Sequence, residues 1–87
     1  MIIELEEYKY KLIGMRKEIA ELRDSLRIDE LTKQVNEMEE KTLDPDFWSD
    51  QTNSSKILQS IKQGKKKLDE FNGLAQRLED AIALADM

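Results

Sequence analysis

Apolar residues recur at alternating intervals of three and four along the first part of the chain. This spacing places their side chains on one stripe of an α-helix, as at the a and d positions of a heptad repeat. The stripe predicts a helix over about residues 2–26 that packs against another helix. Its members are Leu5, Tyr8, Leu12, Met15, Ile19, Leu22 and Leu26.

A second apolar stripe, from Leu31 through Val35 and Met38 to Thr42, begins out of phase with the first. The change of phase predicts a turn near Arg27 and Ile28, followed by a second helix over about residues 30–43. We expect Asp29 to cap this helix, because a carboxylate accepts hydrogen bonds from the free amide groups of a first turn.

The longest stripe lies in the last part of the chain and predicts a helix over about residues 51–86. At 1.5 Å per residue this helix would be ~50 Å long, with Asp50 or Thr52 as its cap. Asn72-Gly73 is a typical turn pair, but the stripe passes through it in phase, which favours an uninterrupted helix over a break. The stripe consists of Ile57, Ile61, Gly64, Leu68, Phe71, Ala75, Leu78 and Ile82.

The stretch "LDPDFWSD" between the second and third stripes contains the only proline and the only tryptophan. Pro45 ends the preceding helix, because proline lacks an amide hydrogen and disfavours helical geometry at the residue before it. Asp44 and Pro45 suit the cap and first position of a short helical turn. Two interpretations of the aromatic pair stay open. Phe47 and Trp48 pack as a lid over the end of the helices, which we favour, or Trp48 is exposed and docks a partner.

These patterns predict an all-α fold, an elongated, antiparallel three-helix, coiled-coil-like bundle with one long C-terminal helix. We expect one domain over residues 1–87 in which the first two helices fold back on each other and the third packs along both. Gly64 and Ala75 lie within the third stripe, where small residues let a neighbouring helix approach closely.

The composition favours solvated helices and argues against an enzyme. Charged residues make up 38% of the chain, its net charge is -5, and it contains no cysteine or histidine. Disulfides, the usual zinc sites and the commonest general base are therefore excluded. The acids of "DPDFWSD" lack the glycine and terminal glutamate of a calcium loop. We expect no catalytic residue, no cofactor and no metal, and a cytoplasmic protein that contacts neither membrane nor DNA.

The run "KQGKKK" is the one concentrated group of basic residues. Lys62 and Lys66 are four residues apart and share a helix face, with Lys65 beside them. One interpretation is a solvated face next to Asp69 and Glu70, which we favour. The other is a local contact with phosphate groups, which would position a nucleic acid without reading its sequence. These three lysines and Trp48 are the candidate partner-contact residues.

The chain from about Ile19 onward resembles the N-terminal helical domain of the bacterial peptide chain release factor 2 family. The first eighteen residues fit only as generic helix. The most specific shared element is the proline-acid-apolar-tryptophan run. The residues that carry the resemblance are Leu22-Arg23, Asp29, Pro45-Asp46-Phe47-Trp48 and Asp50.

The resemblance implies an accessory domain of a class I translation termination factor, which directs peptidyl-tRNA release on the ribosome at UGA or UAA. The implied partners are the ribosome, at the GTPase-associated region of its large subunit, and the class II release factor, a GTPase. The family's Ser-Pro-Phe and Gly-Gly-Gln tripeptides do not occur in this sequence. The resemblance therefore assigns no catalytic residue, and we expect a part truncated from a longer factor.

An alternative to the release-factor interpretation is a free-standing coiled-coil protein that oligomerises through its stripes or serves as a scaffold. Self-association of the 87-residue chain is compatible with both interpretations.

Overall fold

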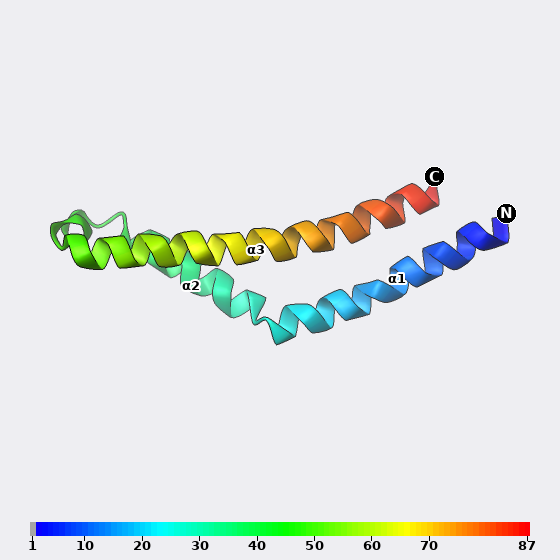
Figure 1. The fold of residues 1–87 in the computed structure, drawn as a ribbon, viewed down its shortest axis with the longest axis horizontal. Helices are drawn as coiled ribbons and strands as arrows, with labels where there is room; N and C mark the ends of the chain where they lie inside the picture. Colours follow the sequence, from blue (N-terminus) through cyan, green and yellow to red (C-terminus); the bar gives the residue numbers. More distant parts are fainter. Residues whose placement is uncertain (1) are drawn as a thin grey trace.

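The structure is a computed structural model that describes residues 2–87, and it is helical and elongated (Figure 1). It contains α1 (Ile2–Ser25), α2 (Ile28–Lys41), a 3₁₀ helix η1 (Pro45–Ser49) and α3 (Gln51–Asp86). The molecule measures 64 × 23 × 15 Å, and its radius of gyration is 18.9 Å. A compact domain of this length would have a radius of gyration of about 12 Å. The predicted all-α, elongated fold with a long C-terminal helix is confirmed.

The first two helices lie end to end, and α3 runs antiparallel along both of them (Figure 1). The prediction that α1 and α2 fold back on each other is therefore wrong. Their lengths of 24 and 14 residues together match the 36 residues of α3, so each covers one part of the long helix. The chain changes direction at Arg27, whose backbone is left-handed with φ 53° and ψ 48°. One residue in this conformation bends the path of the chain without reversing it.

The second helix begins at Ile28, earlier than the pattern predicted, and ends at Lys41. The Ile28 side chain is only 2% exposed, so it belongs to the core and not to a solvent-exposed turn. The predicted cap at Asp29 is also wrong, because Arg27 occupies the cap position and provides no side-chain hydrogen bond. Asp29 lies in the first turn of α2 and accepts a hydrogen bond from Arg23 instead. A carboxylate in this turn still compensates the positive end of the helix dipole.

The long helix α3 contributes most of the core. It continues through Asn72 and Gly73 without a break, as the phase of the stripe predicted. Its cap is Asp50, whose side chain accepts a hydrogen bond from the amide of Asn53 at 3.1 Å. Burial along the predicted stripe explains why α2 and α1 pack against this face. The buried hydrophobic residues of the described chain are Ile28, Val35, Phe47, Ile61, Phe71, Leu78 and Ile82.

Close approach of α2 to α3 occurs at Gly64, which is buried. A β-carbon added there would lie 2.5 Å from the Cγ2 atom of Val35. Real β-carbons essentially never have so short a contact. Only glycine therefore fits at this crossing of α2 and α3 without a shift of Val35, which confirms the expected role of a small residue within the stripe.

The first helix is packed much more loosely than the other two. Among its side chains that the structure describes, none is buried. Leu12, Ile19 and Leu22 are half-buried against the rest of the molecule, whereas the other stripe positions are exposed. The prediction of a packed stripe is therefore only partly right for α1. The exposed members of this stripe are Leu5, Tyr8, Met15 and, directly after α1, Leu26.

Within residues 2–87, none of the helices combines the length and the apolar character needed to cross a lipid bilayer.

Candidate partner-binding surfaces

The segment after α2 forms an ordered turn because its side chains hold its own backbone. Pro45 occupies the first position of η1, and Asp44 caps it by accepting a hydrogen bond from the amide of Asp46 at 3.0 Å. The Ser49 hydroxyl donates to the carbonyl oxygen of Asp46 at 2.6 Å. The predicted short helical turn is therefore present, and it fixes the direction of the two aromatic side chains that follow Asp46.

Phe47 and Trp48 have different environments, although their rings touch. Phe47 is 8% exposed and packs into the core, whereas Trp48 is 56% exposed. The ring centroids are 4.9 Å apart with an interplanar angle of 87°, which is an edge-to-face contact. The predicted lid is right for Phe47 and wrong for Trp48. A single turn of 3₁₀ helix directs adjacent side chains to different sides, so it cannot bury both.

Exposed Trp48 is nevertheless held in place. Its indole nitrogen donates a hydrogen bond to the carbonyl oxygen of Thr42 at 3.2 Å. Thr42 is the C-terminal cap of α2, where helix carbonyl groups lack partners within the helix. The bond therefore satisfies a free carbonyl group and fixes the ring on the surface.

Leu43 is a second exposed apolar residue in this region, at 81% exposure. The apolar spacing did not predict it as a site residue, although the sequence contains one signal: Leu43 lies outside every apolar stripe and directly precedes the acidic turn. We call Leu43 and Trp48 together the tip surface. It lies in the connection between α2 and α3, at the end of the rod opposite both chain ends (Figure 1).

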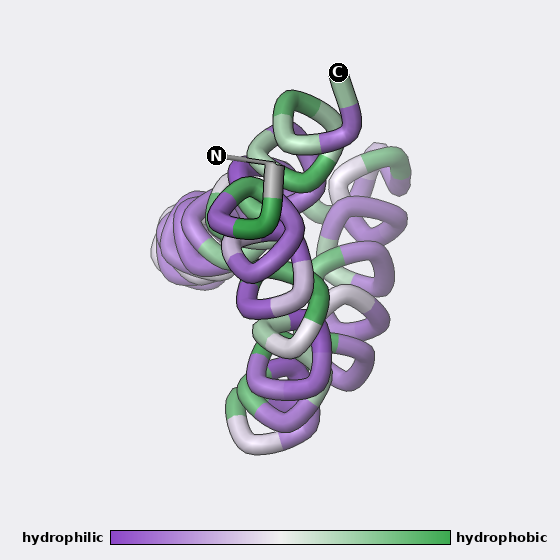
Figure 2. Tube along the Cα trace, turned by 90° about the vertical axis from the view of Figure 1, so that its right-hand side faces the viewer, coloured by the Kyte–Doolittle hydropathy of each residue, from purple (hydrophilic) through white to green (hydrophobic). Residues whose placement is uncertain are grey.

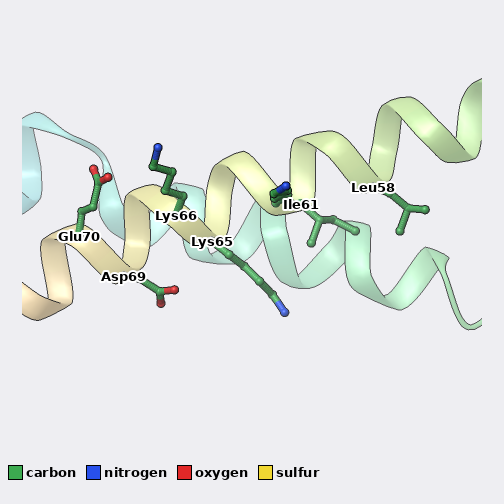
Figure 3. A pocket seen from close by; sticks show the side chains of 7 residues that line it. Leu58, Ile61, Lys65, Lys66, Asp69 and Glu70 are labelled. Atoms are coloured by element: carbon green, nitrogen blue, oxygen red, sulfur yellow. The ribbon is translucent and has the colours of Figure 1, made fainter.

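The three candidate lysines do not converge on one point. The Nζ atom of Lys65 forms an ion pair with Glu39 of α2 at 3.1 Å. Figure 3 shows Lys65 and Lys66 pointing to opposite sides of α3. Among the described residues, no carboxylate forms an ion pair with Lys62 or Lys66. The structure thus separates Lys65, which joins two helices, from Lys62 and Lys66.

The surface around these lysines is open and mixed in charge. Asp69 and Glu70 lie one turn along α3 from Lys65 and Lys66 and point away from each other (Figure 3). Leu58 and Ile61 provide the apolar part of the lining. The arrangement allows Lys62 and Lys66 to contact a phosphate group, but the neighbouring carboxylates limit the positive potential. We call Lys62 and Lys66 the basic pair.

Charged contacts also join α1 to α3 near the chain ends. Arg16 donates two hydrogen bonds to the carboxylate of Glu79, at 2.7 and 2.9 Å, and Lys9 pairs with Asp86. The hydrogen bond from Arg16 and its charge lower the pKa of Glu79. The hydrogen bond to Asp86 and its charge raise the pKa of Lys9. These pairs fix the register of α1 on α3 and lie outside both candidate surfaces.

No group of three or more histidine, cysteine, aspartate or glutamate side chains within residues 2–87 is arranged to hold a metal ion.

Comparison with known proteins identifies relatives along the whole chain. The chain is 32% identical over all 87 residues to a protein of Clostridium perfringens (strain SM101 / Type A) named Peptide chain release factor 2, of which it spans 24%. Proteins of the same name from Lactiplantibacillus plantarum and Rickettsia bellii are also similar. The first is 33% identical over 78 residues, which are 90% of this chain and 21% of the relative. The second is 31% identical over 87 residues, which are 100% of this chain and 23% of the relative.

The chain therefore spans about a quarter of the length of the curated relatives it matches. No protein-family model matches it, and no solved structure gives a significant match. The resemblance to peptide chain release factor 2 is confirmed, and it extends over the first eighteen residues as well, which had fitted only as generic helix.

Proposed function

We propose that this chain is the N-terminal helical domain of a class I translation termination factor of the release factor 2 type. The observation that carries the proposal is the similarity of the whole chain to about a quarter of several such factors. In this proposal the complete factor directs peptidyl-tRNA release at UGA or UAA on the ribosome, in the cytoplasm. The remaining polypeptide reads the codon and promotes hydrolysis, so the 87-residue chain is not an enzyme by itself.

The role we assign to the domain is to position the factor and to offer a surface to partners. Its shape supports this role, because a rod 64 Å long carries the tip surface at one end and both chain ends at the other (Figure 1). A partner bound at the tip surface would be held far from the rest of the factor. We propose that this partner is the GTPase-associated region of the large ribosomal subunit or the class II release factor GTPase.

Each candidate surface suits a different kind of contact. Trp48 is an exposed aromatic residue in a fixed position, and tryptophan is enriched among the residues that dominate protein–protein binding energies. The basic pair suits phosphate groups of ribosomal RNA, which are contacted mainly by lysine and arginine. Because the whole chain is acidic, with a net charge of -5, an RNA contact has to be local.

A release assay on ribosome complexes stalled at UGA tests the proposed function. The assay compares the complete factor, the factor without residues 1–87, and residues 1–87 alone. We expect no release by residues 1–87 alone and weaker ribosome binding or slower GTPase-dependent recycling of the shortened factor. Codon-dependent release by residues 1–87 alone, or unchanged behaviour of the shortened factor in every step, would overturn the proposal.

The two surfaces are tested separately in the complete factor. Replacing Lys62 and Lys66 by glutamine should reduce the slope of log K against log salt concentration by about 0.7 to 0.9 for each lost phosphate contact. Lys11 and Lys17 on α1 are matched controls, because they are also exposed and their replacement changes the charge equally. Identical slopes for the two double variants would remove the basic pair from the interface.

The tip surface is tested by Trp48→Ala, measured as the affinity of the complete factor for the ribosome and for the class II GTPase. Leu74→Ala is the control, since Leu74 is an exposed apolar residue of α3 outside the tip surface. We expect affinity to fall for Trp48→Ala and not for Leu74→Ala. Equal affinities would show that Trp48 is not a contact residue.

A second candidate function is self-association as a free-standing coiled-coil protein, and one observation favours it. The heptad positions Leu5, Tyr8 and Met15 of α1, and Leu26 directly after it, are exposed and available to another helix. A reading frame that ends at Met87, together with a sedimentation coefficient that rises with concentration, would support this candidate over the release-factor domain.

A further inference from the structure

Both chain ends lie at the same end of the rod (Figure 1), and exposed apolar residues gather there. Figure 2 shows hydrophobic segments near the N-terminal and C-terminal labels alike. We call these residues the terminal surface. They are Ile3, Leu5, Tyr8 and Tyr10 of α1, Leu84 of α3, and Met87.

The first turns of α1 expose apolar side chains in more than one direction. Ile3 and Tyr10 are seven residues apart and share one face, whereas Leu5 and Tyr8 are three residues apart and share another. At 100° per residue these two faces lie on nearly opposite sides of the helix. A helix that is apolar on opposite sides is typical of one covered by protein on both. In the structure all four side chains are exposed.

The charges around the terminal surface define the chemistry of what would cover it. Glu4, Glu6 and Glu7 lie between its apolar residues, so carboxylates outnumber the two lysines nearby, Lys9, which pairs with Asp86, and Lys11. Among the described residues, none of these carboxylates forms an ion pair. A fitting partner is therefore apolar at its centre and basic at its edge. A second copy of this chain fits poorly, because a two-fold symmetric contact over these first turns would bring the same carboxylates of both copies together.

We propose that the terminal surface is covered by the polypeptide that follows Met87 in the complete factor, through an apolar segment with basic residues at its edge. This inference rests on the proposed function, in which this chain is the N-terminal domain of a longer factor; the chain spans 24% and 23% of two such relatives. In that protein the following polypeptide leaves α3 within reach of the terminal surface. Tethering gives it a high effective concentration there, so even weak apolar contacts would be occupied.

Such an interface would have a mechanical consequence for the factor. If α1 and the end of α3 are both held by the following polypeptide, the rod is fixed in direction and the tip surface occupies a defined position. If only the backbone at Met87 connected them, the rod would swivel and the tip would have no fixed place.

Hydroxyl-radical footprinting of the complete, ribosome-free factor tests the inference. Oxidation of Tyr8 and Tyr10 in the native factor is compared with their oxidation in the denatured factor, with Trp48 as an internal exposed reference. We expect Tyr8 and Tyr10 to be protected and Trp48 to remain reactive. We also expect the double variant Ile3→Glu/Leu5→Glu to lose the protection of Tyr8 and Tyr10, while its far-ultraviolet circular dichroism is unchanged.

Three outcomes would overturn the inference. The first is that Tyr8 and Tyr10 are as reactive as Trp48 in the free factor. The second is that their protection grows with factor concentration, which would indicate a second copy. The third is that they are protected only in the ribosome complex. The same preparation is assayed for release at UGA. A factor that is active while Tyr8 and Tyr10 stay reactive refutes this inference alone, whereas a factor inactive in release refutes the proposed function.

Discussion

Val35 packs directly against the backbone of Gly64, with its Cγ2 atom 2.5 Å from the point where a β-carbon on Gly64 would stand. Val35 is 2% exposed and branched at its β-carbon, so it has little freedom to move aside. The contact sets the distance between α2 and α3 and explains why a glycine occupies the middle of a long helix.

Replacing Gly64 by alanine should destabilise the protein although alanine is the better helix former. Overpacking a tight core contact costs about 1 to 3 kcal/mol. The gain in helix propensity offsets at most about 1 kcal/mol of this. Urea denaturation followed by circular dichroism measures the difference. Gly14→Ala is the control, because apart from the neighbouring residues and the backbone of its own helix no atom lies within 4 Å of an added β-carbon there. It should be neutral or stabilising, and equal effects at both positions would contradict the packing argument.

Phe47 and Trp48 should contribute very differently to stability. Phe47→Ala removes a buried ring and should lower the free energy of unfolding by about 3 kcal/mol. Trp48→Ala removes an exposed ring and one hydrogen bond to Thr42, which is worth about 1 kcal/mol. Circular dichroism is the suitable probe, since Trp48 is the only tryptophan. A larger loss for Trp48→Ala would show that the ring is buried in solution.

Asp50 and Asp29 provide a matched comparison of a capping and a non-capping aspartate. Asp50→Ala removes the acceptor for the amide of Asn53 and should cost about 1 kcal/mol. Asp29→Ala removes only an exposed ion pair with Arg23 and a favourable helix-dipole charge, so it should cost less. Chemical denaturation of both variants measures which of them loses more unfolding free energy. The reverse order would mean that α2 depends on Asp29 as a cap after all.

Acid should weaken the contact between α1 and α3 through Glu79. Arg16 lowers the pKa of Glu79 in the folded protein, by its hydrogen bond first and its charge second. A carboxyl group with a lowered folded pKa stabilises fully above its unfolded value of about 4.3, and this contribution is lost as the pH falls through the lowered pKa.

Thermal unfolding between about pH 7 and about pH 3 at low salt tests this expectation, since the unfolded pKa of glutamate lies between these values. The melting temperature of Glu79→Gln should fall less between these pH values than that of the parent protein. High salt should reduce this difference, because Arg16 and Glu79 are both exposed. Glu18→Gln is the control, because Glu18 is an exposed carboxylate of α1 without an ion pair among the described residues. Equal pH profiles for the two variants would exclude a role for the Arg16–Glu79 pair.

The helices, the uninterrupted α3 and the turn at Pro45 could all be predicted from the sequence. Each of these follows from local chemistry: the spacing of apolar residues within one helix, the missing amide hydrogen of proline, and a carboxylate that caps from a neighbouring position. The stripe of α3 also identified most of the core correctly, because that helix packs along both others.

The directions of these elements relative to one another depend on tertiary packing and could not be predicted from the sequence. A periodic stripe shows which residues share a face of one helix, but it does not show which neighbour covers that face. The left-handed backbone at Arg27 places α1 and α2 end to end, which buries Ile28 outside any stripe and leaves half of the α1 stripe exposed. The same non-local packing turns Trp48 outward and pairs Lys65 with Glu39. These outcomes depend on contacts between distant parts of the chain, and the local spacing of residues carries no information about such contacts.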